Sequence, residues 1–81
     1  MISMTRSKFK ANLAQALDCK DQYVDDETLE KFLDLNFDED SSLADWDFQD
    51  FYWFATDVCQ DGFWGTCREW DLHYPGENAY F

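Results

Sequence analysis

The sequence predicts a mainly α-helical single domain of about three helices with a short C-terminal β or irregular segment, and leaves open an α+β fold. The chain has 81 residues, the length of one small domain. Apolar residues recur at helical spacing in three separate stretches. Aromatic residues make up 20% of the chain. Disordered acidic segments are poor in aromatic residues, so this chain is expected to fold around a core.

Charge divides the domain (residues 1–81) into three segments. Residues 1–20 form a helix with a basic tip, residues 21–61 an acidic helical region, and residues 62–81 a C-terminal segment rich in glycine and aromatic residues. The first helix is expected from about Thr5 to Leu17, with apolar side chains on one stripe at Phe9, Leu13, Ala16 and Leu17. Its first turn is basic, which is unfavourable at the positive end of a helix dipole. These side chains are therefore expected to reach acids elsewhere in the fold.

The second helix is expected from about Asp26 to Leu35. Asp25 is suited to the N-cap, and Val24 can pack on Leu29 as a hydrophobic staple. The predicted inward residues are Leu29, Phe32 and Leu33. The opposite face of this amphipathic helix is acidic, with Glu27, Glu30 and Asp34.

The third helix is expected between a capping box at Ser42 and Asp45 and a stop at Gly62. Its predicted apolar stripe comprises Phe48, Phe51, Tyr52, Ala55, Val58 and Cys59. A separate arc carries Asp47, Asp50, Asp57 and Asp61, flanked by Trp46, Trp53 and Phe54. A β-hairpin that turns at Asp61-Gly62 is the alternative for this region.

The C-terminal segment shows a different periodicity. Arg68, Trp70, Leu72 and Tyr74 alternate with Glu69, Asp71 and His73, a period of two that predicts a strand over Thr66–Tyr74. Its pairing partner lies either within the chain or in a second copy, so a homodimer stays open. Across the whole chain, the predicted core comprises Phe9, Leu13, Leu17, Leu29, Phe32, Leu33, Phe48, Phe51, Tyr52, Ala55 and Val58.

Charge limits the classes of partner. The chain has 18 acidic and 6 basic residues and a formal net charge of −12, so direct binding to nucleic-acid phosphates is not expected. No apolar run is long enough to span a membrane, and the N-terminus lacks the apolar region of a secretory signal. We therefore expect a protein of the host cell cytosol with a basic protein partner.

Enzymatic chemistry is not expected, and neither is a cofactor or a metal. The single histidine, His73, has no recognisable nucleophile beside it. The three cysteines are interpreted as reduced thiols, because a zinc site made of Cys59, Cys67 and His73 would have a non-standard spacing. A single EF-hand-like calcium loop over residues 34–45 is a further alternative, although Glu39 stands where the sharp turn needs glycine.

The acidic faces suggest a function. Carboxylates on two helices can imitate the phosphates of a nucleic acid, and nearby aromatic side chains can anchor a protein interface. In composition and size the chain is similar to the DNA-mimic inhibitors that phages and plasmids encode, of the anti-restriction and anti-CRISPR type, which evade host defence. The predicted partner is a basic nucleic-acid-binding protein, such as a nuclease or a restriction or CRISPR complex subunit.

The predicted partner-binding residues combine these acids with two tryptophans: Glu27, Glu30, Asp34, Asp38, Glu39, Asp40, Asp45, Asp47, Asp50, Asp57, Asp61, Trp46 and Trp53. Two alternatives remain. One is an immunity or antitoxin protein that blocks a basic nuclease or toxin through one compact acidic and aromatic patch. The other is a small assembly module, in which exposed aromatic residues join copies of the chain and the acids keep it soluble.

Overall fold

The computed structural model of the protein describes residues 4–38 and 40–76. Along this part of the chain the order is α1 (Arg6–Cys19), α2 (Asp26–Asn36), the short 3-10 helix η1 (Ser42–Asp45), α3 (Phe48–Asp61) and α4 (Phe63–Glu69). No strand occurs among these residues, and the prediction of a mainly helical domain is confirmed. None of the described helices has the length and apolarity needed to cross a membrane.

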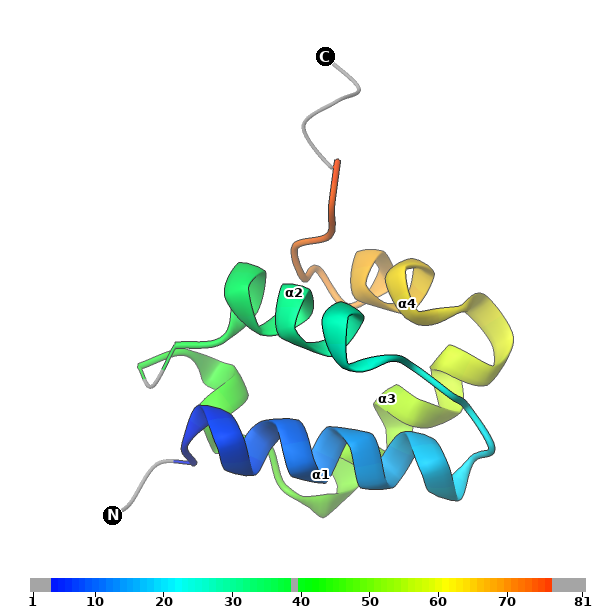
Figure 1. Ribbon diagram of the computed structural model, residues 1–81, viewed down its shortest axis with the longest axis horizontal. Coiled ribbons are helices and arrows are strands. Elements are labelled where there is room, and N and C mark those ends of the chain that lie inside the picture. The colour runs from blue at the N-terminus through cyan, green and yellow to red at the C-terminus, as the bar shows by residue number, and fades with distance from the viewer. Residues whose placement is uncertain (1–3, 39, 77–81) are drawn as a thin grey trace.

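The helices pack in a simple arrangement. Helices α1 and α2 run antiparallel, and the loop that joins them lies at the right of Figure 1. Helix α1 contacts both α2 and α3, whereas α4 folds back against α3. The chain therefore has an α1–α2 side and an α3–α4 side, with the core between them (Figure 1).

Local signals explain the starts of the first two helices, which agree with the prediction. The Thr5 hydroxyl accepts a hydrogen bond from the Lys8 backbone N–H at 3.2 Å. The Asp25 carboxylate accepts one from the Thr28 N–H at 3.0 Å. Each bond satisfies an N–H group that has no partner within its helix.

The predicted start of the third helix is wrong. Residues Ser42–Asp45 form the separate turn η1, and Trp46 has an extended backbone (φ −60°, ψ 135°) that ends it. The capping box lies instead at Asp47 and Asp50: each side chain accepts a hydrogen bond from the other residue's backbone N–H, at 3.1 and 3.0 Å. Gly62 ends α3 as predicted, at a positive φ of 78° that favours glycine.

The predicted C-terminal strand is also wrong, because this segment begins with α4. Asp71 takes a left-handed conformation (φ 59°). The next N–H, of Leu72, bonds to the Cys67 carbonyl at 2.8 Å, which closes the helix in a Schellman motif. Beyond this turn, the backbone N–H and C=O of His73 pair with the side-chain amide of Asn36 at 2.7 and 2.9 Å. Asn36 thus supplies the hydrogen bonds that a neighbouring strand was expected to supply.

The core confirms most of the predicted apolar residues but corrects three positions in α3. The buried cluster comprises Phe9, Leu13, Leu17, Leu29, Phe32, Leu33, Leu43, Phe51, Phe54, Ala55, Val58 and Cys67. Phe48 and Tyr52, predicted to be buried, are 83% and 37% exposed, whereas Phe54 is fully buried. From Phe48 onward, the inward face follows Phe51, Phe54, Ala55 and Val58, at i, i+3, i+4 and i+7.

Candidate protein-binding surface

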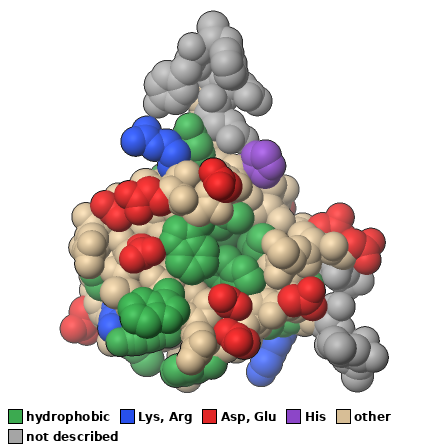
Figure 2. Space-filling model, turned by 180° about the vertical axis from the view of Figure 1, so that it is seen from behind, with side chains coloured by type: hydrophobic (Ala, Val, Ile, Leu, Met, Phe, Trp, Pro, Cys, Tyr) green, Lys and Arg blue, Asp and Glu red, His purple; other side chains and the backbone are tan. Residues whose placement is uncertain are grey.

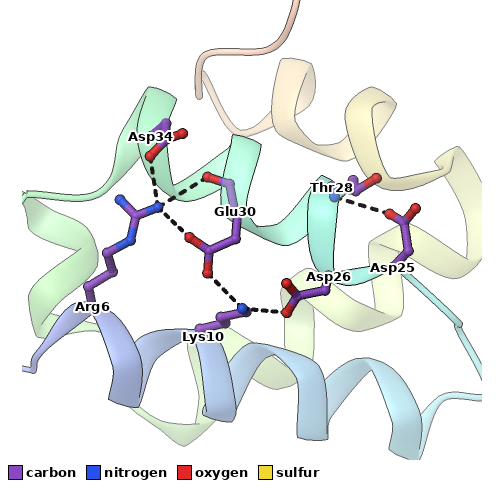
Figure 3. A network of polar contacts seen from close by, with 7 residues as sticks. All are labelled: Arg6, Lys10, Asp25, Asp26, Thr28, Glu30 and Asp34. Atoms are coloured by element: carbon purple, nitrogen blue, oxygen red, sulfur yellow. Dashed lines mark hydrogen bonds and ion pairs between the residues drawn. The ribbon is translucent and has the colours of Figure 1, made fainter.

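The acids of α2 that face α1 are paired within the chain. The Arg6 guanidinium contacts the carboxylates of Glu30 and Asp34 at 2.8 and 2.7 Å. The Lys10 ammonium contacts Glu30 at 2.6 Å and also pairs with Asp26 (Figure 3). The expectation that the basic first turn reaches acids elsewhere is confirmed for Arg6, whose partner helix is α2. Lys8, in the same turn, has no ion pair with a described residue.

The pKa directions in this network agree with mutual stabilisation of the charged forms. Hydrogen bonds from Lys10 and Arg6 lower the pKa of Glu30. Hydrogen bonds to Asp26 and Glu30 raise the pKa of Lys10, and those to Glu30 and Asp34 raise the pKa of Arg6. Because these groups are partly exposed, water screens the pairs and each contributes modestly to stability. Glu30 and Asp34 are predicted site residues whose charge is offset by α1.

Two other predicted site residues hold the start of α3. Asp47 and Asp50 form the reciprocal capping box described above. Their carboxylates accept backbone N–H groups and lie at the positive end of the helix dipole. Because they cap α3, replacing them would also loosen the start of the helix.

A cluster of carboxylates lies where α3 meets α4. The Trp70 indole N–H donates to the Asp57 carboxylate at 2.8 Å. A hydrogen bond with Asp61 raises the pKa of Glu69, aided by some desolvation and by the charges of Asp61 and Asp57, while Arg68 opposes the shift. After Lys31, Arg68 is the one further Lys or Arg in the sequence. This end of the molecule therefore concentrates negative charge with little local compensation.

The remaining predicted acids lie on α2 and around η1. Glu27, Asp40 and Asp45 are exposed, and their side chains have no hydrogen bond or ion pair with another described residue. Asp38 is exposed in the turn before η1, where its carboxylate accepts the Asp40 backbone N–H at 3.1 Å. The prediction for Glu39 falls outside the described residues.

The two predicted tryptophans differ in exposure. Trp46 is half-buried, and its ring centroid lies 5.2, 5.3 and 5.5 Å from those of Phe9, Phe51 and Phe54. It is therefore mainly a packing residue, and its expected role as an exposed anchor is not supported by this position. Trp53, in contrast, is 58% exposed.

Sequence reasoning missed two neighbours of Trp53. The Tyr52 ring stacks on Trp53 at 5.2 Å between centroids and lies 6.5 Å from Phe48. We call the row Phe48, Tyr52 and Trp53 the aromatic face. The Asp47-x-x-Asp50 capping box was the signal that could have placed Phe48 at the helix start and revealed this face. Seen from behind in Figure 2, the molecule shows hydrophobic side chains at the centre and lower left, with acidic side chains spread around them.

A groove of about 640 Å³ runs between α1 and α3 beside the aromatic face. We call it the α1–α3 groove. Its lining residues are Asn12, Gln15, Ala16, Cys19, Lys20, Trp46, Asp47, Phe48, Phe51 and Tyr52. The Lys20 ammonium lies 4.1 Å above the centroid of the Tyr52 ring, a cation–π contact.

The thiols and acids do not assemble a metal centre in the described part of the chain, where no group of three or more His, Cys, Asp or Glu side chains could hold a metal ion. The alternative zinc site would need Cys67, which is fully buried, and Cys59, which is exposed. Burial raises the pKa of the Cys67 thiol to about 12, so this thiol is protonated and unreactive at neutral pH. Cys19 and Cys59 are free exposed thiols.

Taken together, the fold and surface define a small acidic helical domain in which α3 carries both an exposed aromatic face and several carboxylates. No family model, curated protein or solved structure matches the chain. Its function is therefore argued from this surface.

Proposed function

We propose that the protein is a non-catalytic inhibitor that occupies the basic nucleic-acid-binding groove of a target protein. The observation that carries this proposal is that α3 combines the exposed aromatic face with Asp47 and Asp50 at its start and Asp57 and Asp61 in its second half. A phage or plasmid inhibitor of restriction or CRISPR proteins is the setting that this class of protein suggests.

Charge and aromatic contacts would act at different stages of binding. A net charge of −12 attracts a basic groove at long range and speeds association. Exposed aromatic side chains then supply contact area that desolvates on binding, and such residues dominate interface hot spots. From Asp50 to Asp61 the helix rises roughly 16 Å, so these acids can meet several basic side chains along one groove.

A second candidate, an immunity or antitoxin protein, is favoured by one feature. The predicted acidic strip over two helices is interrupted, because Arg6 and Lys10 pair with Glu30 and Asp34. The uncompensated acids and the exposed aromatic row then form a compact patch around α3. Such a patch suits the active site of one basic nuclease or toxin, without imitating the spacing of phosphates.

Affinity capture with nucleic acid as the eluent tests the proposal. The protein is immobilised and exposed to cytosol of its native host at low salt, and bound proteins are eluted with duplex DNA or RNA. We expect a basic nucleic-acid-binding protein that the nucleic acid displaces. A dedicated small toxin would favour the immunity candidate. Capture only of other proteins, which nucleic acid does not displace, or no capture at all, would contradict both candidates.

A further inference from the structure

The α1–α3 groove has a surface suited to an apolar side chain. Helix α1 contributes the uncharged residues Asn12, Gln15, Ala16 and Cys19 to its lining. From the α3 side, Phe51 is buried and Phe48 is 83% exposed. Covering these rings would remove apolar surface from water, which is the main favourable term in association.

The charges around the groove indicate what should accompany that apolar side chain. The Lys20 ammonium already covers one face of the Tyr52 ring, and Trp53 stacks on the same ring, so a further cation would meet the other rings. Phe48 and Trp53 present further rings to solvent. Asp47 lines the groove, and the exposed Asp45 precedes it by two residues. Arginine and lysine can stack on such rings and pair with such carboxylates.

The net charge argues against a second copy of the chain as the occupant. Each copy carries a formal charge of −12, so two copies repel each other on approach. A basic segment is attracted by the same field. Charge complementarity therefore favours a basic segment over a second copy of the chain as the occupant of the groove.

We propose that the α1–α3 groove holds a basic segment of the target protein, with a bulky aliphatic side chain inserted between α1 and α3 and flanking Arg or Lys side chains on the aromatic face and Asp47. This inference rests on the proposed function, since it takes the partner to be basic. It adds the place of contact and the chemistry of the segment. The anchor is apolar, and the charges surround it.

A helical peptide with leucines on one face and arginines on the others is the probe. Two matched peptides serve as controls: one replaces the leucines by alanine at the same charge, and the other replaces the arginines by glutamine. We expect the leucine–arginine peptide to bind at least about tenfold more tightly than either control. It should also slow alkylation of Cys19, which lines the groove, more than that of Cys59, which is exposed outside the lining.

Two variants locate the site. Phe48→Ala should weaken binding of the peptide by about tenfold or more. Because the Phe48 side chain is exposed, this substitution should leave the fold intact. Tyr23→Ala removes another aromatic residue, 91% exposed and outside the lining, and should leave the affinity unchanged. Circular dichroism of both variants verifies the fold.

Several results would overturn the inference: no binding of the peptide, equal binding of the alanine control, or no effect of Phe48→Ala. Protection of Cys19 that grows with the protein's own concentration would point instead to a second copy. The inference and the proposed function can also fail separately. If nucleic acid displaces the captured target and the Phe48→Ala variant still binds that target normally, only the proposed role of the α1–α3 groove is excluded. If the leucine–arginine peptide binds as expected but no captured target is displaced by nucleic acid, only the inhibitor function is excluded.

Discussion

The two sides of the molecule use carboxylates in different ways. On the α1–α2 side, Glu30 and Asp34 pair with bases of α1 at hydrogen-bonding distance. On the α3–α4 side, Asp61 and Glu69 lie against each other, so that the pKa of Glu69 is raised. The first arrangement stabilises the fold, and the second is repulsive when both groups are ionised. A charge that costs stability is better explained by binding than by folding.

The aromatic residues show the same difference between the two sides. Phe9 of α1 and Phe32 of α2 are fully buried. Helix α3 has aromatic residues on both faces, with Phe54 buried and Phe48 and Trp53 exposed. Among the helices, the exposed rings therefore occur on the side with the uncompensated acids, which is why the proposed binding role is given to α3 and a structural role to the contact between α1 and α2.

The largest expected effect separates the two faces of α3. Phe54→Ala should lower the free energy of unfolding by about 3–5 kcal/mol, because it leaves a cavity in the core. Phe48→Ala should change it by no more than about 0.5 kcal/mol, as is usual for an exposed position. Urea denaturation of both variants measures the difference. Equal losses would show that the two faces of α3 are assigned incorrectly.

The next effect concerns the start of α3. Asp47→Ala removes the N-cap and should cost about 1 kcal/mol. Asp45→Ala removes the same charge two residues earlier, from a side chain without a hydrogen bond to another described residue, and should not destabilise the protein. Thermal unfolding of the two variants distinguishes loss of the cap from loss of charge. A destabilised Asp45→Ala would argue for the helix start at Ser42.

The stability of the contact between α1 and α2 should depend on the position of a basic side chain as well as on its charge. Lys10→Gln leaves Asp26 without its base and Glu30 with Arg6 alone, so the melting temperature should fall. Lys8→Gln makes the same charge change at an exposed residue that has no ion pair with the described residues, and should have a smaller effect. The difference should shrink as salt screens the pairs. If both variants melt alike, the ion pairs contribute nothing specific.

The smallest expected effect is a change in how the stability of the protein depends on pH. Since the folded-state pKa of Glu69 is raised, the folded protein holds this proton where the unfolded chain has lost it. Its contribution to stability is present below the unfolded value of about 4.3 and is lost as pH rises through the folded pKa. Glu69→Gln should therefore stabilise the protein near neutral pH and differ little from the wild type in acid. Glu30, whose pKa is lowered, contributes with the opposite sign: its stabilisation is lost as pH falls through its folded pKa.

Melting temperatures between pH 4 and pH 7 test this, with Glu27→Gln as the control for loss of one exposed charge. A Glu69→Gln variant that is less stable than the wild type at neutral pH would show that the carboxylate forms a favourable contact. The α3–α4 cluster would then resemble the contact between α1 and α2.

Local patterns predicted part of this fold. The stripes Phe9, Leu13, Leu17 and Leu29, Phe32, Leu33 follow from helical periodicity, and Gly62 marks a helix end by its positive φ. The ends of α1 and α4 were harder to predict, because Asp21 and Asp71 adopt the left-handed conformation that glycine usually takes. The alternation after Thr66 resembled a strand, but Asn36, distant in sequence, supplies the pairing.

The site was less predictable than the fold. Composition and spacing identified the acids and Trp53, but the buried face of α3 depends on how this helix packs against α1 and α4. The sequence pattern placed Phe48 and Tyr52 in the core, whereas the structure buries Phe54. Pairing of Glu30 with Arg6, 24 residues away, depends on how α1 packs against α2. Tertiary contacts, which single-sequence patterns do not contain, decide which carboxylates remain uncompensated.

The most direct test compares two charge-matched variants in binding to the captured target. Asp45→Asn with Asp61→Asn removes two charges from η1 and α3, and Asp18→Asn with Glu27→Gln removes two from α1 and α2. The carboxylates of Asp18 and Glu27 form no hydrogen bond or ion pair with another described residue. Asp50 and Asp57 are unsuitable for this test, because each accepts a hydrogen bond that supports the fold. At low salt, the first variant should associate more slowly and bind more weakly than the second. Equal losses would contradict the central claim, because the acids would then act as a uniform coat rather than as part of one binding face.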